Sequence, residues 1–273
     1  MPLMRYPLFI TLLFLISCAN HKSGVTGIYG HGKTLAYIYH NNGKAGLLDT
    51  AKNVILPAQF DYIEDWQVDG LIRVDSGGMK ITGGNVVGYD FNKYGLVTIS
   101  GQILFRPQFD ELRVADNSAL VRVDTLFGYV NDNGNWLIKP KYKVAYPFYK
   151  GTAVVQDSGH FVLLDKQGEK IISQTFDTIW SFKNDVAVVE KNKQWGFINY
   201  QGRLILPLDN YRGIGEYSWY FGKFQRDGKW FVIDTAGNIP IKEGFDEVET
   251  RGDEDSVFAV GKQNGKSVKI KLK

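Results

Sequence analysis

Short apolar runs separated by polar turns fill most of the chain and predict an all-β fold. Runs such as ALVRVD, TAVVQD and DVAVVE are rich in β-branched residues, which suits strands, and they are too short for helices. Several runs end in Asn-Gly or Asp-Gly, dipeptides that permit the positive φ angles of a two-residue hairpin turn. Such turns are expected at Asn42-Gly43, Asp227-Gly228 and Asn264-Gly265.

The same segment recurs six times, and each copy can be aligned on an anchor position that is usually glycine. An aromatic residue precedes five of the six anchors, and a glycine follows five of them at plus 6. Phe-Asp stands at plus 14 and plus 15 in four copies, while Tyr142-Lys143 fills that place in another. Three offsets in register indicate a true repeat. The anchors are Gly46, Gly95, Gly128, Val162, Gly196 and Phe231.

Each copy is expected to form three short antiparallel strands. Strand A precedes the anchor, strand B carries it, and strand C follows the plus-6 glycine, which suits the left-handed end of a turn. Pro107, Pro140 and Pro207 then end the pairing. Because one unit cannot bury its apolar face alone, neighbouring units should share a continuous core that holds the recurring aromatics. We predict a tandem array of about six to seven three-stranded units, either a propeller-like ring or an open β-solenoid.

At these residues the chain resembles the WG-repeat family, named for a Trp-Gly pair followed by a phenylalanine or similar residue, a turn glycine and a closing I-x-P-x-[FY]-D motif. Trp195-Gly196-Phe197 keeps the full signature, whereas the other copies depart from it. The resemblance covers about Thr34 to Asp246, with a partial last copy from Ser256 to Lys273. It implies a binding or scaffolding role on an exported or lipid-anchored bacterial protein, and it supplies no catalytic residues.

The N-terminus predicts export. Arg5 precedes the apolar stretch YPLFITLLFLI, which is too short to span a bilayer and fits a secretory signal peptide. The next residues complete the motif LISC, which ends at Cys18 and resembles a bacterial lipobox; an ordinary signal peptide with an incidental cysteine is the alternative. We expect a lipoprotein signal peptide at 1–17, a lipidated N-terminus and tether at 18–33, and a β-repeat domain at 34–273. The N-terminal lipid is then expected to anchor the protein in a membrane of the bacterial cell envelope, the outer membrane.

Charge and one motif bear on nucleic acids and nucleotides. The chain carries 32 Lys and Arg residues against 29 Asp and Glu residues and has no basic run, so we expect no nucleic-acid partner. Residues 27–34, GIYGHGKT, match the phosphate-binding pattern G-x-x-x-x-G-K-[ST]. That pattern needs a buried strand before it and a helix after it, whereas LAYIYHNNGKAGLLD downstream alternates and then turns. We therefore expect a hairpin with Lys33 on its surface, and no nucleotide or other cofactor.

Three other groups of residues have side chains that occur in metal, catalytic or calcium sites. The histidines at 21, 31, 40 and 160 lack a second ligand at metal-binding spacing, so no metal site is expected. Residues 157–160, DSGH, place a nucleophile beside a base, but this is ordinary turn composition, and a surface turn provides no oxyanion hole. Residues 251–253, RGD, and the acids after them fit a polar loop without the spacing of a calcium site.

The expected function is a non-catalytic, lipid-anchored binding or scaffolding module whose partner is an envelope protein or a glycan. The alternative is an envelope hydrolase acting on a glycan or cell-wall substrate, with a site built from loops of several copies. Such an enzyme needs paired carboxylates, and only the aspartates at plus 15 could supply them. Their recurrence in four copies favours a structural role instead.

An insertion in the second copy is the candidate contact site. The anchors at 46 and 95 lie 49 residues apart, against about 34 elsewhere, and repeat insertions often mark the binding face. The surplus SGGMKITGGNVVGYDFNK is expected to form an extra hairpin too short to have its own core. Exposed apolar groups on such an element often mark a contact surface. The candidate residues are Met79, Lys80, Tyr89 and Phe91.

Overall fold

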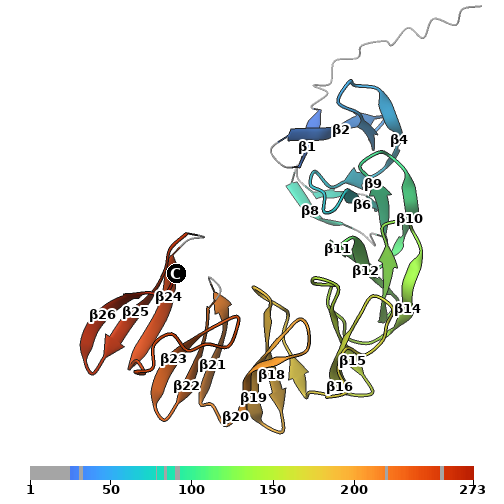
Figure 1. The fold of residues 1–273 in the computed structure, drawn as a ribbon. Helices are drawn as coiled ribbons and strands as arrows, with labels where there is room; N and C mark the ends of the chain where they lie inside the picture. Colours follow the sequence, from blue (N-terminus) through green and yellow to red (C-terminus); the bar gives the residue numbers. More distant parts are fainter. Residues whose placement is uncertain are drawn as a thin grey trace, which may run out of the picture.

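The chain folds into a row of small antiparallel sheets. The computed structural model describes residues 25–30, 33–77, 79–82, 85–89, 93–218, 221–252 and 255–273. All regular structure in these residues is β-strand, and seven sheets follow one another along an open arc in chain order (Figure 1). This confirms the predicted all-β tandem array.

Units 1 to 3 are four-stranded. Unit 1 contains β1 (Thr26–Gly30), β2 (Lys33–Asn41), β3 (Lys44–Leu48) and β4 (Val54–Phe60). Unit 2 contains β5 (Tyr62–Ile63), β6 (Leu71–Ser76), β9 (Lys93–Thr98) and β10 (Ile103–Phe109). Unit 3 contains β11 (Glu111–Ala115), β12 (Ser118–Val123), β13 (Leu126–Asn131) and β14 (Trp136–Tyr142).

Units 4 to 7 are less regular. Unit 4 contains β15 (Ala153–Asp157) and β16 (His160–Leu164), and unit 5 contains β17 (Thr178–Ile179), β18 (Val186–Lys191), β19 (Gln194–Asn199) and β20 (Leu204–Asp209). Unit 6 contains β21 (Gly213–Ser218), β22 (Phe221–Arg226) and β23 (Lys229–Asp234). Unit 7 contains β24 (Glu247–Gly252), β25 (Val257–Gln263) and β26 (Lys266–Lys271).

The repeat pattern accounts for three strands of each full unit, and the structure adds a fourth. This leading strand starts directly after strand C of the preceding unit and pairs with strand A, as β11 does with β12. It carries no fixed motif, so the offsets from the anchor do not reveal it. In unit 1 the leading strand is β1, which pairs with β2 and lies in the segment expected as a tether.

The position of β1 decides between a ring and an open array. A ring would need β1 to complete the last unit, but β1 joins unit 1 and the last unit keeps three strands. Figure 1 shows unit 1 and unit 7 at opposite ends of the arc. The protein is therefore an open array rather than a closed propeller.

The hydrophobic core lies between units rather than inside them. Each of six buried clusters combines side chains of two consecutive units, from units 1 and 2 to units 6 and 7. Strand B supplies both sides, because its side chains alternate: Tyr129 packs towards unit 4 and Val130 towards unit 2. The plus-14 aromatics are buried as predicted, with exposed fractions from 0% to 6%. They are Phe60, Phe109, Tyr142, Phe176 and Phe245.

The anchor glycine lets strand C approach strand B. A Cβ on Gly128 would lie 2.6 Å from the Ile138 carbonyl oxygen, where β14 bulges over β13. A Cβ added at Gly46, Gly95 or Gly196 would likewise lie 2.5–2.6 Å from a carbonyl oxygen of strand C. Units 4 and 6 have Val162 and Phe231 at the anchor, and their strand C is reduced to isolated bridges. The two units that have a side chain at the anchor are thus the two in which strand C does not pair continuously with strand B.

The turn between strands B and C repeats the same geometry. Plus-6 residues adopt left-handed φ angles, +84° at Gly202 and +70° at Lys52, which confirms the prediction for this turn. The residue at plus 3 accepts backbone hydrogen bonds across the turn: Asp165 Oδ1 accepts from the Gln167 and Glu169 N–H groups, both at 2.9 Å. This polar residue is a second turn determinant that the glycine pattern alone did not reveal.

Gly202→Val is expected to lower the free energy of unfolding by more than about 1 kcal/mol, because a side chain is strained at this φ. The added Cβ would also crowd Ile172 of unit 4. Since neighbours share cores, amide hydrogen exchange should increase in units 4 and 6 as well as in unit 5. Lys52→Gly, at the equivalent turn, is the matched control and should leave stability unchanged or higher. Faster exchange confined to residues 201–203 would contradict the shared core.

Candidate functional site

Four copies place an aspartate between consecutive units. In the second copy, Lys93 Nζ of unit 2 donates to Asp110 Oδ1 (2.5 Å). The N–H of Asp124, in the β12–β13 turn of unit 3, donates to Asp110 Oδ2 (2.8 Å). One carboxylate thus connects two units, an arrangement that we call the aspartate clamp. The aspartates at this position are Asp61, Asp110, Asp177 and Asp246.

The clamp recurs at two further junctions. Asp177 Oδ2 accepts a hydrogen bond from the Asn192 N–H of unit 5 (2.6 Å), and Asp246 Oδ2 accepts one from the Gly265 N–H of unit 7 (2.8 Å). Both donors lie in the turn between strands A and B of the following unit. In unit 2 the insertion replaces this turn, and Asp61 pairs with Lys44 of its own unit (2.6 Å). The recurring acids therefore lie at separate junctions and do not converge on one cleft.

The residue two places before the anchor varies together with the aspartate. It is basic in every copy that has the aspartate: Lys44, Lys93, His160 and Lys229. In the two copies without the aspartate it is Leu126 or Gln194. The hydrogen bond from Lys93 lowers the pKa of Asp110, and that from Lys229 lowers the pKa of Asp246. This pairing confirms the structural role that recurrence predicted for the acids at plus 15.

The two junctions without the aspartate contain hollows. Between units 3 and 4, an open hollow of ≈ 800 Å³ lies between the end of β14 and the β15–β16 turn. Between units 5 and 6, one of ≈ 550 Å³ lies between the end of β20 and the β22–β23 turn. A further hollow, between units 6 and 7, runs along β24 to β26 rather than at a turn.

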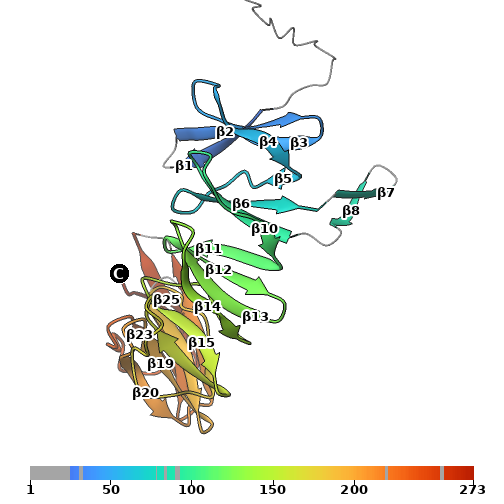
Figure 2. The same ribbon diagram turned by 90° about the vertical axis from the view of Figure 1, so that its right-hand side faces the viewer.

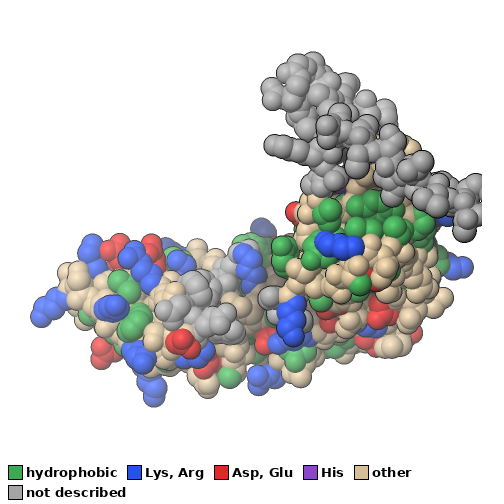
Figure 3. Space-filling model, turned by 90° about the horizontal axis from the view of Figure 1, so that it is seen from above, with side chains coloured by type: hydrophobic (Ala, Val, Ile, Leu, Met, Phe, Trp, Pro, Cys, Tyr) green, Lys and Arg blue, Asp and Glu red, His purple; other side chains and the backbone are tan. Residues whose placement is uncertain are grey.

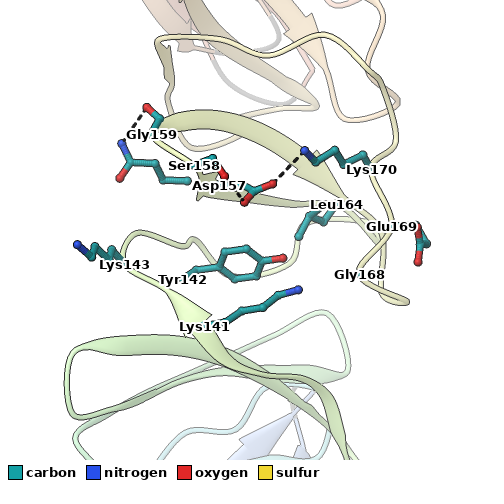
Figure 4. A pocket seen from close by; sticks show the side chains of 11 residues that line it. Lys141, Tyr142, Lys143, Asp157, Ser158, Gly159, Leu164, Gly168, Glu169 and Lys170 are labelled. Atoms are coloured by element: carbon teal, nitrogen blue, oxygen red, sulfur yellow. Dashed lines mark hydrogen bonds and ion pairs between the residues drawn. The ribbon is translucent and has the colours of Figure 1, made fainter.

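The hollow between units 3 and 4 is lined by charged and polar side chains. Figure 4 shows Lys141 and Lys143 on one side and the turn at Asp157 and Ser158 on the other. Lys170 Nζ lies 2.9 Å from Asp157 Oδ2, and this hydrogen bond lowers the pKa of Asp157. The DSGH segment singled out in the sequence is this turn, with left-handed φ angles at 158 and 159.

Two buried carboxyl groups flank Arg73. Glu64 and Asp75 are 6% and 5% exposed, and Arg73 donates a hydrogen bond to Glu64. Burial, with the Asp61 charge nearby, raises the pKa of Asp75 to about 6; burial also raises the pKa of Glu64, although Arg73 opposes it. Raised carboxyl pKa values are found in general acids. Here Arg73 also donates to the Leu112 carbonyl of unit 3 (3.2 Å), which makes the group part of a junction.

The insertion forms the hairpin that its sequence predicts. β7 (Met79–Thr82) pairs with β8 (Asn85–Tyr89), placing Met79 opposite Tyr89, and no other described strand joins this sheet. Figure 2 shows the hairpin projecting from the side of the arc. The structure describes the backbone of Met79, Lys80 and Tyr89, whereas Phe91 and the expected lipidation site Cys18 lie outside the described residues.

The remaining sequence motifs take ordinary positions. Lys33 and Thr34 begin β2 rather than a helix, so the phosphate-binding pattern lacks its required context. Arg251 and Gly252 end strand β24. Among the described residues, no three His, Cys, Asp or Glu side chains form a group that could hold a metal ion. In the same part of the chain, no helix is long and apolar enough to cross a membrane.

Comparison with known proteins identifies the repeat. The family model described as WG containing repeat matches residues 46–79, 127–159, 163–195 and 195–230. The chain carries WG repeats. The matches start at or beside the anchor on strand B, so each family repeat covers the end of one structural unit and the start of the next. A search of the curated proteins finds no match.

Solved structures resemble this array only in outline. Kluyveromyces lactis Hsv2p is 10% identical, with 86% of this chain and 92% of that chain covered and a TM-score of 0.39. A eukaryotic initiation factor is 11% identical, covering 93% and 78%, with a TM-score of 0.43. A Bacteroides caccae protein of unknown function is 12% identical, covering 70% and 83%, with a TM-score of 0.26. At this level the likeness carries no argument about function.

Asp110→Ala is expected to lower the free energy of unfolding by about 1 kcal/mol at neutral pH, because the Lys93 and Asp124 hydrogen bonds are lost. The folded-state pKa of Asp110 is lowered, so its contribution is present above the unfolded pKa of about 4 and disappears as pH falls through the folded value. Denaturation of both proteins from pH 7 to pH 2 measures this. Asp132→Ala, in an exposed turn, is the control. A difference that persists unchanged at pH 2 would contradict the clamp.

Proposed function

We propose that this protein is a lipid-anchored, exported module of a bacterial cell envelope that binds or scaffolds another molecule without catalysing a reaction. The aspartate clamp is the observation that carries the proposal. A hydrolase would need paired acids in a shared cleft. The acids at plus 15 instead bind turns and lysines at separate junctions, and Glu64 and Asp75 are buried. An open repeat array offers an extended surface, which suits binding.

The two ends of the array support an orientation towards a membrane. Tyr29 of unit 1 is 64% exposed, and its backbone forms a β-bridge with Trp66 of unit 2, which is 50% exposed. Figure 3 shows hydrophobic side chains gathered on this end. At the other end, Lys269 Nζ lies 4.2 Å from the ring centroid of Phe258 and covers it. Terminal repeats normally carry polar outer faces, and Trp and Tyr favour the membrane–water interface.

The tether would hold unit 1 close to the bilayer. Residues 19–25 separate Cys18 from the first strand, and seven residues reach at most about 24 Å. A lipid on Cys18 would therefore keep the exposed Tyr29 and Trp66 within reach of the membrane surface. The rest of the arc would extend away from it.

Cys18→Ala is expected to release the protein from the membrane fraction into the soluble envelope fraction, because the lipid is the main source of membrane affinity. Fractionation after a high-salt wash, together with uptake of a labelled fatty acid, measures this. Cys18 is the chain's one cysteine, so any thioether-linked label reports on this position. The anchor is refuted if the variant stays with membranes and the wild type incorporates no fatty acid.

The projecting hairpin is proposed as a partner contact. Its strands pair only with each other, and the last pair of strands A and B beneath it is Ser76 with Lys93. Residues 77–92 can therefore be replaced by Asn-Gly, which restores the two-residue turn found in other units. The unit beneath should remain intact.

This deletion is expected to leave the melting temperature unchanged and to reduce recovery of envelope partners in a pull-down. Replacing Asp124-Thr125, the corresponding turn of unit 3, with Asn-Gly is the matched control and should retain the partners. A deletion variant that folds normally and recovers the full set of partners would remove the hairpin from consideration.

A further inference from the structure

The junction between units 3 and 4 departs from the repeat in a specific way. The residue at plus 15 is Lys143 instead of aspartate, and its partner position holds Leu126 instead of a basic residue. At the clamped junctions, a carboxylate accepts a hydrogen bond from the following A–B turn. Here the corresponding turn, at Ser158 and Gly159, faces a junction in which that carboxylate has been replaced by a cation.

Cationic groups line the space that the missing carboxylate leaves. Lys141 and Lys143 come from the end of β14, and both are exposed. Lys143 forms no ion pair with any described residue. Asp157 is paired with Lys170 and also interacts electrostatically with Lys141, and Figure 4 shows Glu169 at the far side of the hollow. An anion entering from solvent therefore meets the charge of Lys143 and the backbone N–H groups of a turn.

We propose that this hollow binds an acidic saccharide through a carboxylate, which takes the place of the missing clamp aspartate. The carboxylate pairs with Lys143 and accepts a hydrogen bond from the β15–β16 turn, as Asp110 accepts one from the β12–β13 turn. At ≈ 800 Å³ the hollow is much larger than one carboxylate, so further parts of the ligand lie within it.

The lining favours a saccharide over a peptide. Gln156, Ser158, Asp157 and Glu169 offer amide, hydroxyl and carboxylate partners for sugar hydroxyl groups. A peptide usually needs apolar pockets, whereas most of this lining is charged or polar, and Tyr142 and Leu164 are buried.

The second junction without the aspartate follows the same rule. Asn210 and Tyr211 stand where Phe-Asp stands elsewhere, and the hollow beside the Asp227-Gly228 turn is lined by Arg212 and Arg226. Both junctions that lack the clamp aspartate thus have basic side chains in their hollows, here together with Asp209 and Asp227. The junction between units 3 and 4 is the larger and the better suited to a test.

The test uses the purified full chain and three probes: trigalacturonic acid, neutral galactotriose, and triglutamate peptide. Amide chemical shifts are followed by NMR during titration. Trigalacturonic acid is expected to shift the Ser158 and Gly159 amides, and galactotriose is not. Absence of a shift at these amides would overturn the site, and equally tight binding of triglutamate would overturn its assignment to a saccharide.

Two variants make the test specific. Lys143→Asp restores the clamp within the chain, so it should weaken trigalacturonic acid binding by about tenfold or more and slow exchange at the β15–β16 turn. Lys143→Gln removes the charge without adding a clamp and should weaken binding as well. Lys242→Asp, an exposed site in unit 6, makes the same charge change and should bind normally. Wild-type affinity in both Lys143 variants would refute the proposal.

This inference deepens the proposed binding role and rests on it only in assuming that the array has a ligand. The titration needs no membrane, so its failure leaves the Cys18 anchor standing. Equally, loss of the anchor would leave the titration result unaffected.

Discussion

The structure depends on the contact between consecutive units. A sheet of two to four short strands has two faces and almost no interior, so each unit must bury its apolar side chains against a neighbour. Strand B makes this possible, since alternate residues such as Tyr129 and Val130 enter different cores. Most of the stability therefore comes from the interfaces between consecutive units, as in other repeat proteins.

The aspartate clamp adds directional polar bonds to these apolar contacts. Apolar packing can slide, whereas the Asp110 carboxylate must satisfy Lys93 and the Asp124 N–H at once. The clamp therefore fixes where the next turn lies. The two junctions that lack the aspartate contain hollows lined with both basic and acidic side chains. Substitution at a structural position of the repeat thus changes the surface of a junction without altering the fold.

Much of this could be predicted from sequence because the repeat samples each role several times. The anchor, the turn glycine such as Gly202, and the plus-14 aromatics such as Phe109 recur at fixed offsets, and each has a single physical reason. The offsets from the anchor do not predict the leading strands of units 2, 3, 5, 6 and 7, because these strands follow no fixed motif. The sequence also did not decide between a closed ring and an open array. That choice depends on whether β1 pairs with unit 1 or with the last unit, and no local pattern encodes this pairing.

The loss of the clamp between units 3 and 4 is visible in the sequence as two substitutions that occur in the same copy. Lys143 in place of aspartate coincides with Leu126 in place of a basic residue, but the spacing does not say that the two positions touch. Nor does it say that the second carboxylate oxygen binds the following unit, which only the stacking of units reveals.

Native-state hydrogen exchange at increasing denaturant tests the central claim most directly, because it measures the opening free energy of each junction in the unmodified protein. If the clamp and the shared core hold the array together, the amides around the junctions of units 3–4 and 5–6 should open first. Those around the clamped junction of units 2–3 should open later. Opening in the reverse order, or at one uniform free energy along the array, would contradict the account.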